Sequence, residues 1–129
     1  MKHAMIIESN RIVSAELSKH LTRLGFHSFD HVWTEEDAIA VADKRRPDLL
    51  LVGDRLETGS PIAAARAICV KHDVPALLVT SDSSKARQRL GEGALLDGPF
   101  AFSNISKAVS AAQSNDFMLA AQDRCLAPA

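Results

Sequence analysis

The sequence predicts an α/β fold in which helices cover both faces of a parallel sheet of five strands. Two patterns in the chain indicate this arrangement. Short apolar runs alternate with segments whose apolar residues recur at helical spacing, and the runs are apolar throughout instead of alternating with polar residues. Strands of this kind, joined by helices, form a three-layer, doubly wound sheet. We expect the strand order 2-1-3-4-5.

Five segments are expected to form the strands, and all of them are short and mainly apolar. They are residues 4–7, 26–32, 48–53, 75–79 and 93–96. The second is the weakest, because it contains two histidines and Asp30. The third is the strongest, and Asp54 directly follows its carboxyl end. The fifth is expected to be broken by Gly98 and Pro99.

A helix is expected after each strand, and most of these helices carry a start or stop signal. They cover residues 10–24, 34–46, 60–72, 83–90 and 102–112. Gly25 follows the first helix at a position that favours a left-handed residue. Thr34 is an N-cap followed by acids, which the helix dipole favours, and Pro47 ends that helix. Ser60 caps the third helix, and Pro61 takes its first position.

Length and composition indicate a single domain. A chain of 129 residues of which 47% are hydrophobic can bury one core, and we assign residues 1–115 to it and residues 116–129 to a C-terminal tail or helix extension. Lys and Arg number 15 against 16 Asp and Glu, which argues against a nucleic-acid or membrane partner. The cysteines, Cys69 and Cys125, predict neither a disulfide framework nor a metal cluster, so we expect a cytoplasmic protein.

The candidate site lies where the strands end, because doubly wound sheets bind ligands beyond the carboxyl ends of their strands. Glu8 and Asp54 follow the first and third strands, which are expected to be neighbours, and Thr80 and Ser81 follow the fourth. Two carboxylates can share Mg²⁺, and a carboxylate can also attack a phosphoryl group. A second interpretation remains open for both acids: Glu8 caps the helix that begins near Asn10, and Asp54 only begins a turn.

The order and spacing of four short motifs resemble a CheY-like response-regulator receiver domain, over residues 2 to about 114. The motifs are Ile6-Ile7-Glu8, Pro47-Asp48-Leu49-Leu50-Leu51-Val52-Gly53-Asp54, Val74-Pro75-Ala76-Leu77-Leu78-Val79-Thr80 and Gly98-Pro99-Phe100. This resemblance implies a flavodoxin-like fold and phosphorylation of Asp54 by a histidine kinase or phosphotransfer protein. It also implies Mg²⁺ held by Glu8 and Asp54, and a switch in which Thr80 moves toward the phosphoryl group.

Three positions depart from the family pattern. Ser9 stands where the family has a second acid, Gly98 stands where it has a lysine, and Leu95 stands where it has an aromatic switch residue. The first two changes remove charges that would bind the metal and the phosphoryl group. We therefore expect only weak Mg²⁺ binding.

The sequence as a whole predicts a stand-alone receiver protein that is not an enzyme and signals by contact with a downstream protein or a second copy of itself. The main alternative is a pseudo-receiver, a binding module that works without phosphorylation; Ser9, Leu95 and Gly98 favour it. A flavodoxin-like small-molecule binder or enzyme is a weaker alternative, because Glu8 in the first loop would repel a phosphate.

Overall fold

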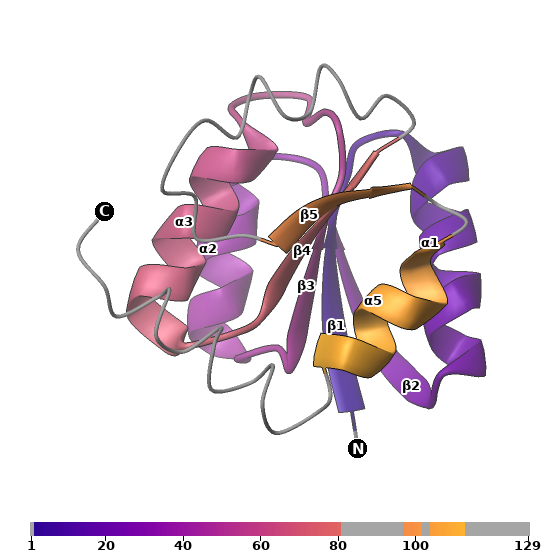
Figure 1. Ribbon diagram of the computed structural model, residues 1–129. Coiled ribbons are helices and arrows are strands. Elements are labelled where there is room, and N and C mark those ends of the chain that lie inside the picture. Colours follow the sequence, from indigo (N-terminus) through magenta and orange to yellow (C-terminus); the bar gives the residue numbers. More distant parts are fainter. Residues whose placement is uncertain (1, 81–96, 102–103, 113–129) are drawn as a thin grey trace.

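The computed structural model describes residues 2–80, 97–101 and 104–112 (Figure 1). Five strands form one parallel sheet in the order β2-β1-β3-β4-β5, as predicted. The strands are β1 (Lys2–Ile7), β2 (Phe26–Val32), β3 (Leu49–Val52), β4 (Ala76–Thr80) and β5 (Asp97–Ala101). The described helices are α1 (Arg11–Arg23), α2 (Glu35–Lys44), α3 (Pro61–His72) and α5 (Ile105–Ala112).

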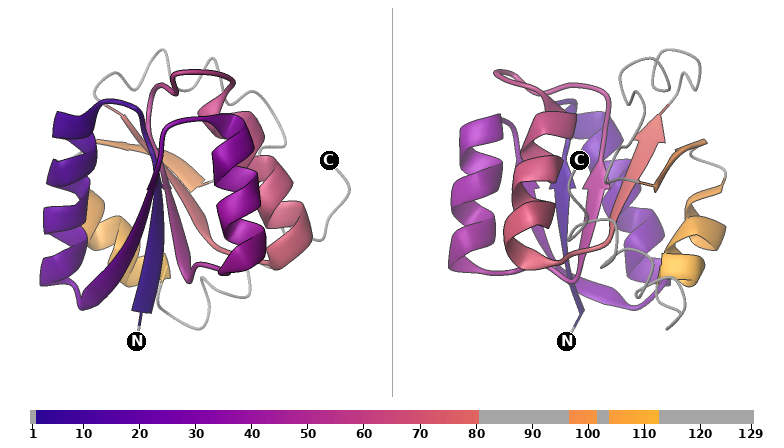
Figure 2. Two further views of the ribbon diagram at one scale, coloured as in Figure 1. Left: turned by 180° about the vertical axis from the view of Figure 1, so that it is seen from behind. Right: turned by 60° about the vertical axis from the view of Figure 1, so that its left-hand side comes forward.

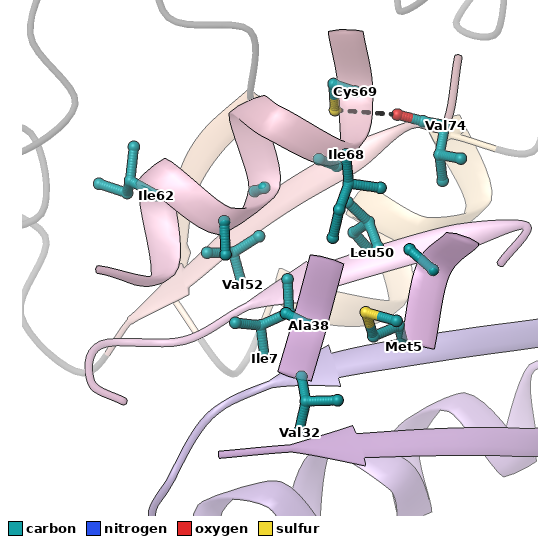
Figure 3. Close-up of a cluster of buried hydrophobic side chains, with 14 of the residues drawn as sticks. Met5, Ile7, Val32, Ala38, Leu50, Val52, Ile62, Ile68, Cys69 and Val74 are labelled. Carbon is teal, nitrogen blue, oxygen red and sulfur yellow. Dashed lines mark hydrogen bonds between the residues drawn. The ribbon is translucent and has the colours of Figure 1, made fainter. Parts of the chain in front are cut away.

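The helices form two layers, with α1 and α5 on one face of the sheet and α2 and α3 on the other (Figures 1 and 2). Successive side chains of β1 lie on opposite faces of the sheet. Met5 and Ile7 pack toward α2 and α3, whereas Ala4 and Ile6 pack toward α1 and α5. The first of these clusters also contains Cys69, whose thiol donates to the carbonyl of Val74 (Figure 3). Burial on both faces explains why the central strands β1, β3 and β4 are mainly apolar.

The expected helix caps are confirmed. The side chains of Thr34 and Ser60 accept backbone N–H bonds from the first turns of α2 and α3. Asn10 caps α1 in the same way, through the N–H groups of Ile12 and Val13. Gly25, after α1, has a φ of 98°, which is the left-handed conformation that glycine adopts without strain.

The prediction that Gly98 and Pro99 break the fifth strand was wrong, because both residues lie inside β5. Asp97 pairs with Leu77 and Phe100 pairs with Val79, so that Gly98 and Pro99 together face the single residue Leu78. This is a β-bulge, and a proline is tolerated there because the ladder is already interrupted. The segment 93–96, which was expected to be the strand, lies outside the described residues.

A second irregularity lies in β2, at the other edge of the sheet. Lys2 pairs with Phe26 and His3 pairs with Ser28, so His27 is an extra residue. The insertion moves Ser28 and Asp30 to the face that His3 occupies, because side chains alternate along a strand.

A polar cluster forms there, at the amino end of the sheet. His3 is 3% exposed, and its Nε2 lies 2.7 Å from Asp30 Oδ2 while its Nδ1 lies 2.7 Å from the Ser28 hydroxyl. Arg45 also donates to Ser28 Oγ, and Asp48 accepts the backbone N–H of His3 at 2.8 Å. We call these five residues the amino-end cluster.

Several predictions concern residues outside the described ranges: the helix at 83–90, Ser81, Leu95, Cys125 and the tail from 116 to 129. Within the part of the chain that the structure describes, no helix is long and apolar enough to cross a membrane.

Candidate functional site

Three of the predicted site residues come together at the carboxyl ends of β1, β3 and β4. Asp54 follows β3 and Thr80 ends β4, which is the neighbouring strand. The Thr80 hydroxyl donates to Asp54 Oδ1 at 2.6 Å. Thr80 is 1% exposed, whereas Asp54 is half-buried, so Asp54 is partly open to solvent and Thr80 is not.

Glu8 lies beside this pair, with both of its carboxylate oxygens bonded to backbone N–H groups. Oε1 accepts from Asp54 at 2.9 Å, and Oε2 accepts from Asn10 at 2.8 Å. The side chain is 2% exposed, and hydrogen bonds to an ionised acceptor compensate for such burial. The interpretation of Glu8 as a residue that binds the start of the first helix is therefore supported, and the carboxylate also holds the backbone of Asp54.

Gly53 makes room for this carboxylate. A Cβ atom at position 53 would lie 2.9 Å from both Cβ and Cδ of Glu8 and closer still to Oε1. These separations are shorter than non-bonded carbon atoms tolerate, so any larger residue would displace Glu8.

Ser9 connects the same two loops through its backbone, since its N–H donates to the carbonyl of Arg55 at 2.9 Å. Its side chain brings a hydroxyl and no charge to the position after Glu8. Gly98 is not brought to the carboxyl edge, because it lies at the bulge opposite Leu78 while Ala101 pairs with Thr80.

The described donor set fits Mg²⁺ only as a site of low charge. Glu8 and Asp54 supply hard oxygen ligands of the kind that Mg²⁺ prefers. No group of three His, Cys, Asp or Glu side chains suited to a metal occurs among the described residues. Mg²⁺ commonly uses one or two carboxylates together with water and phosphate oxygens. Two carboxylates are therefore enough to form a site, but they give it little negative charge.

Glu35 is a residue near this site that the sequence assigns only to the acidic first turn of α2. Its Oε1 accepts the backbone N–H of Ser60 at 2.9 Å, across the loop that connects Asp54 to α3. Gly59, with a φ of 86°, leaves the space for it. An acid in a first helical turn is common, so no signal in the sequence distinguished Glu35 from Glu36.

An aromatic and ionic cluster lies next to this loop, at the start of α1. The Arg11 guanidinium lies over the Trp33 ring at 4.7 Å from its centroid and 3.7 Å from Glu57. Arg11 and Glu57 are both exposed, so we ascribe little stability to the ion pair.

Several solved structures with a similar fold are receiver domains. The signal receiver domain of a modulated diguanylate cyclase from Desulfovibrio desulfuricans G20 is 21% identical with a TM-score of 0.72, and the match covers 85% of this chain and 91% of that one. The receiver domain of the response regulator PhyR from Erythrobacter litoralis is 25% identical with a TM-score of 0.69, over 84% of this chain and 87% of that one.

A third neighbour is the response regulator TrrA from Thermotoga maritima, in complex with Mg²⁺ and BeF. It is 22% identical with a TM-score of 0.70, over 85% of this chain and 97% of that one. TrrA also matches in a complex with the histidine kinase ThkA, at 19% identity and a TM-score of 0.72, over 88% of this chain and 100% of that one. No protein-family model matches the sequence, and no curated protein does.

Proposed function

Because this chain has the fold of CheY-like receiver domains, we propose that it accepts a phosphoryl group on Asp54 and signals by protein contact. The observation that carries the proposal is the 2.6 Å hydrogen bond from Thr80 to Asp54 at the carboxyl edge of the sheet. It places a buried hydroxyl donor against a half-buried carboxylate, on neighbouring strands.

The proposed reaction is phosphoryl transfer from a phosphohistidine. An Asp54 carboxylate oxygen bonds to phosphorus, the phosphorus–nitrogen bond breaks, and the imidazole leaves with the electron pair of that bond. Thr80 donates a hydrogen bond to a transferred oxygen in place of Asp54 Oδ1. When bound at Glu8 and Asp54, Mg²⁺ supplies positive charge that offsets the charge of the phosphoryl oxygens.

The proposed phosphoryl donor is a histidine kinase or a phosphotransfer protein, and the output is contact with a downstream protein. The complex of TrrA with the kinase ThkA supports a donor of this class. TrrA in complex with Mg²⁺ and BeF supports Mg²⁺ as the cofactor. We propose that the chain itself catalyses no turnover, works in the cytoplasm, and binds Mg²⁺ weakly because Ser9 adds no second charge.

A second candidate function is that of a pseudo-receiver, which binds a partner without phosphorylation. The engagement of Glu8 with backbone N–H groups favours it, because the loops of the site are then held together by protein contacts alone. The weaker alternative, a small-molecule binder, has less support. Glu8 already accepts the hydrogen bond of the Asn10 N–H, which could otherwise donate to a phosphate.

Phosphorylation can be tested with Mg²⁺ and the small donor acetyl phosphate, followed by intact-mass measurement. We expect the full chain to gain the mass of one phosphoryl group. The gain should vanish in Asp54→Asn and persist in the matched control Asp37→Asn, which alters an exposed acid at the start of α2. Folded wild-type protein that gains no mass at millimolar Mg²⁺ would instead support the pseudo-receiver.

A further inference from the structure

The loop from β3 to α3, residues 53–60, is bonded to a glutamate side chain at each of its ends. At the first end, Glu8 Oε1 accepts the N–H of Asp54 at 2.9 Å. At the other end, Glu35 Oε1 accepts the N–H of Ser60 at 2.9 Å. The two glutamates come from different parts of the fold, Glu8 from the end of β1 and Glu35 from the start of α2.

A glycine precedes the donor at both ends. A Cβ at Gly59 would lie 2.5 Å from Glu35 Cβ and 2.7 Å from its Oε1, just as a Cβ at Gly53 would collide with Glu8. Each end of the loop therefore has the same three parts: a glycine, the N–H of the next residue, and a glutamate that fills the space a side chain would take. We call each set a clamp.

The second half of the loop is also bonded along its backbone to the segment before α2. The Glu57 N–H donates to the Trp33 carbonyl at 2.7 Å, and the Glu35 N–H donates to the Thr58 carbonyl at 3.1 Å. Thr34 and Thr58 form a parallel bridge between these bonds. The loop is consequently held beside β1 at one end and beside α2 at the other.

We propose that the two clamps position the acceptor, so that Glu8 and Glu35 keep the Asp54 backbone in place without a metal ion. This inference rests on the proposed function, since positioning matters only if Asp54 reacts. Its physical basis is that a carboxylate which accepts a backbone N–H bonds more strongly than a neutral acceptor does. The glycines allow each carboxylate to approach the chain that closely.

Glu35 offers the clearer test, because its carboxylate bonds the far end of the loop from Asp54. Glu35→Ala removes the acceptor, whereas Glu35→Gln keeps an oxygen that can accept the Ser60 N–H. Glu36→Ala is the matched control, since it removes an exposed glutamate from the same helical turn. None of the three changes alters a carboxylate that we assign to Mg²⁺.

The first measurement is amide hydrogen exchange, which reports the clamp whether or not Asp54 reacts. In Glu35→Ala we expect the Ser60 amide to exchange about tenfold faster, as the loss of one hydrogen bond implies. The rate should return toward the wild-type value in Glu35→Gln and stay unchanged in Glu36→Ala. Equal exchange at Ser60 in wild type and Glu35→Ala would overturn the clamp.

The second measurement is the rate of Asp54 phosphorylation by acetyl phosphate as a function of Mg²⁺ concentration. We expect Glu35→Ala to lower the maximal rate severalfold and leave the half-saturating Mg²⁺ concentration unchanged, with recovery in Glu35→Gln. An equal loss in Glu36→Ala, or no loss in Glu35→Ala, would overturn the positioning role. If the wild-type protein is not phosphorylated, the proposed function fails, and with it the positioning role, while hydrogen exchange still decides whether the clamp exists.

Discussion

Two clusters of polar side chains lie at opposite ends of the parallel sheet, and they differ in whether the central residue or its partners are buried. At the amino end, both ring nitrogens of His3 are bonded to other side chains, and the ring is almost wholly buried. At the carboxyl end the partners are buried instead: Glu8 accepts the backbone N–H of Asp54 and Thr80 donates to its carboxylate, whereas Asp54 itself is half-buried.

The amino-end cluster joins elements that neighbour one another in the fold. His3 contributes from β1, Ser28 and Asp30 contribute from β2, and Arg45 and Asp48 contribute from the connection between α2 and β3. Because a fully satisfied polar network rigidifies a fold, we regard this cluster as structural.

The contrast between the two ends is therefore one of solvent access to the central residue. Asp54, partly exposed and held by buried groups, can meet a substrate, whereas the buried His3 ring, bonded at both nitrogens, cannot do so unless its hydrogen bonds break. Two sets of substitutions test this contrast and a third tests His31 of β2, and their expected effects decrease in size from the first to the third.

His3→Ala should cause the largest loss of stability. The change removes two side-chain hydrogen bonds, one of them to a carboxylate, and leaves a cavity, so we expect unfolding in urea to cost about 3 kcal/mol less free energy. His27→Ala is the control, because His27 is exposed on the same pair of strands. Similar losses in the two variants would show that the amino-end cluster contributes little.

Gly53→Ala should have the next largest effect, since the new Cβ would collide with Glu8. We expect a loss of about 1–3 kcal/mol, as for other overpacked positions. In a Glu8→Ala background the space is free, so the same change should cost much less. Equal costs in both backgrounds, measured by urea unfolding, would contradict the role of Gly53 as the space for Glu8.

His31 should produce the smallest effect, and only below neutral pH. His31 is exposed overall, but desolvation of its imidazole lowers the pKa from 6.5, although the charge of Asp30 opposes this. The unfolded chain therefore takes up the proton first as pH falls. The stability contribution is complete above pH 6.5 and is lost as the pH falls through the folded-state pKa.

Thermal melting at about pH 7.5 and about pH 5 tests this sign, in the range where histidine titrates. We expect His31→Gln to lose less stability between these two values than the wild type does. His27→Gln is the control and should keep the wild-type difference. A larger loss in His31→Gln than in the wild type would mean that the sign is wrong.

Much of the fold could be predicted because its signals are local. The buried strands, the caps at Thr34 and Ser60 and the position of Asp54 each depend on a few adjacent residues. The weakness of 26–32 as a strand has a structural explanation, because Asp30 pairs with His3 of the adjacent strand. A single charged residue in a strand does not indicate which distant residue will hydrogen-bond to it.

The parts that could not be predicted depend on register and on long-range contacts. The bulge at Gly98 and Pro99 is decided by pairing with β4, since nothing in a glycine–proline pair indicates whether a strand stops or bulges. The partners of the two Glu8 oxygens could not be predicted, because one of them, the Asp54 N–H, is 46 residues away in the sequence. The assignments of Asp54 as acceptor and of Thr80 as switch stay predictions.

Both edges of the sheet are irregular, and this affects how two molecules can associate. β2 carries an extra residue at His27, and β5 carries a bulge that contains Pro99, whose backbone lacks an N–H group. An edge strand that is bulged or contains proline is a poor template for a strand from another chain. Two copies of this protein should therefore associate through helices and loops. Pairing of strands between molecules is disfavoured at both edges of the sheet.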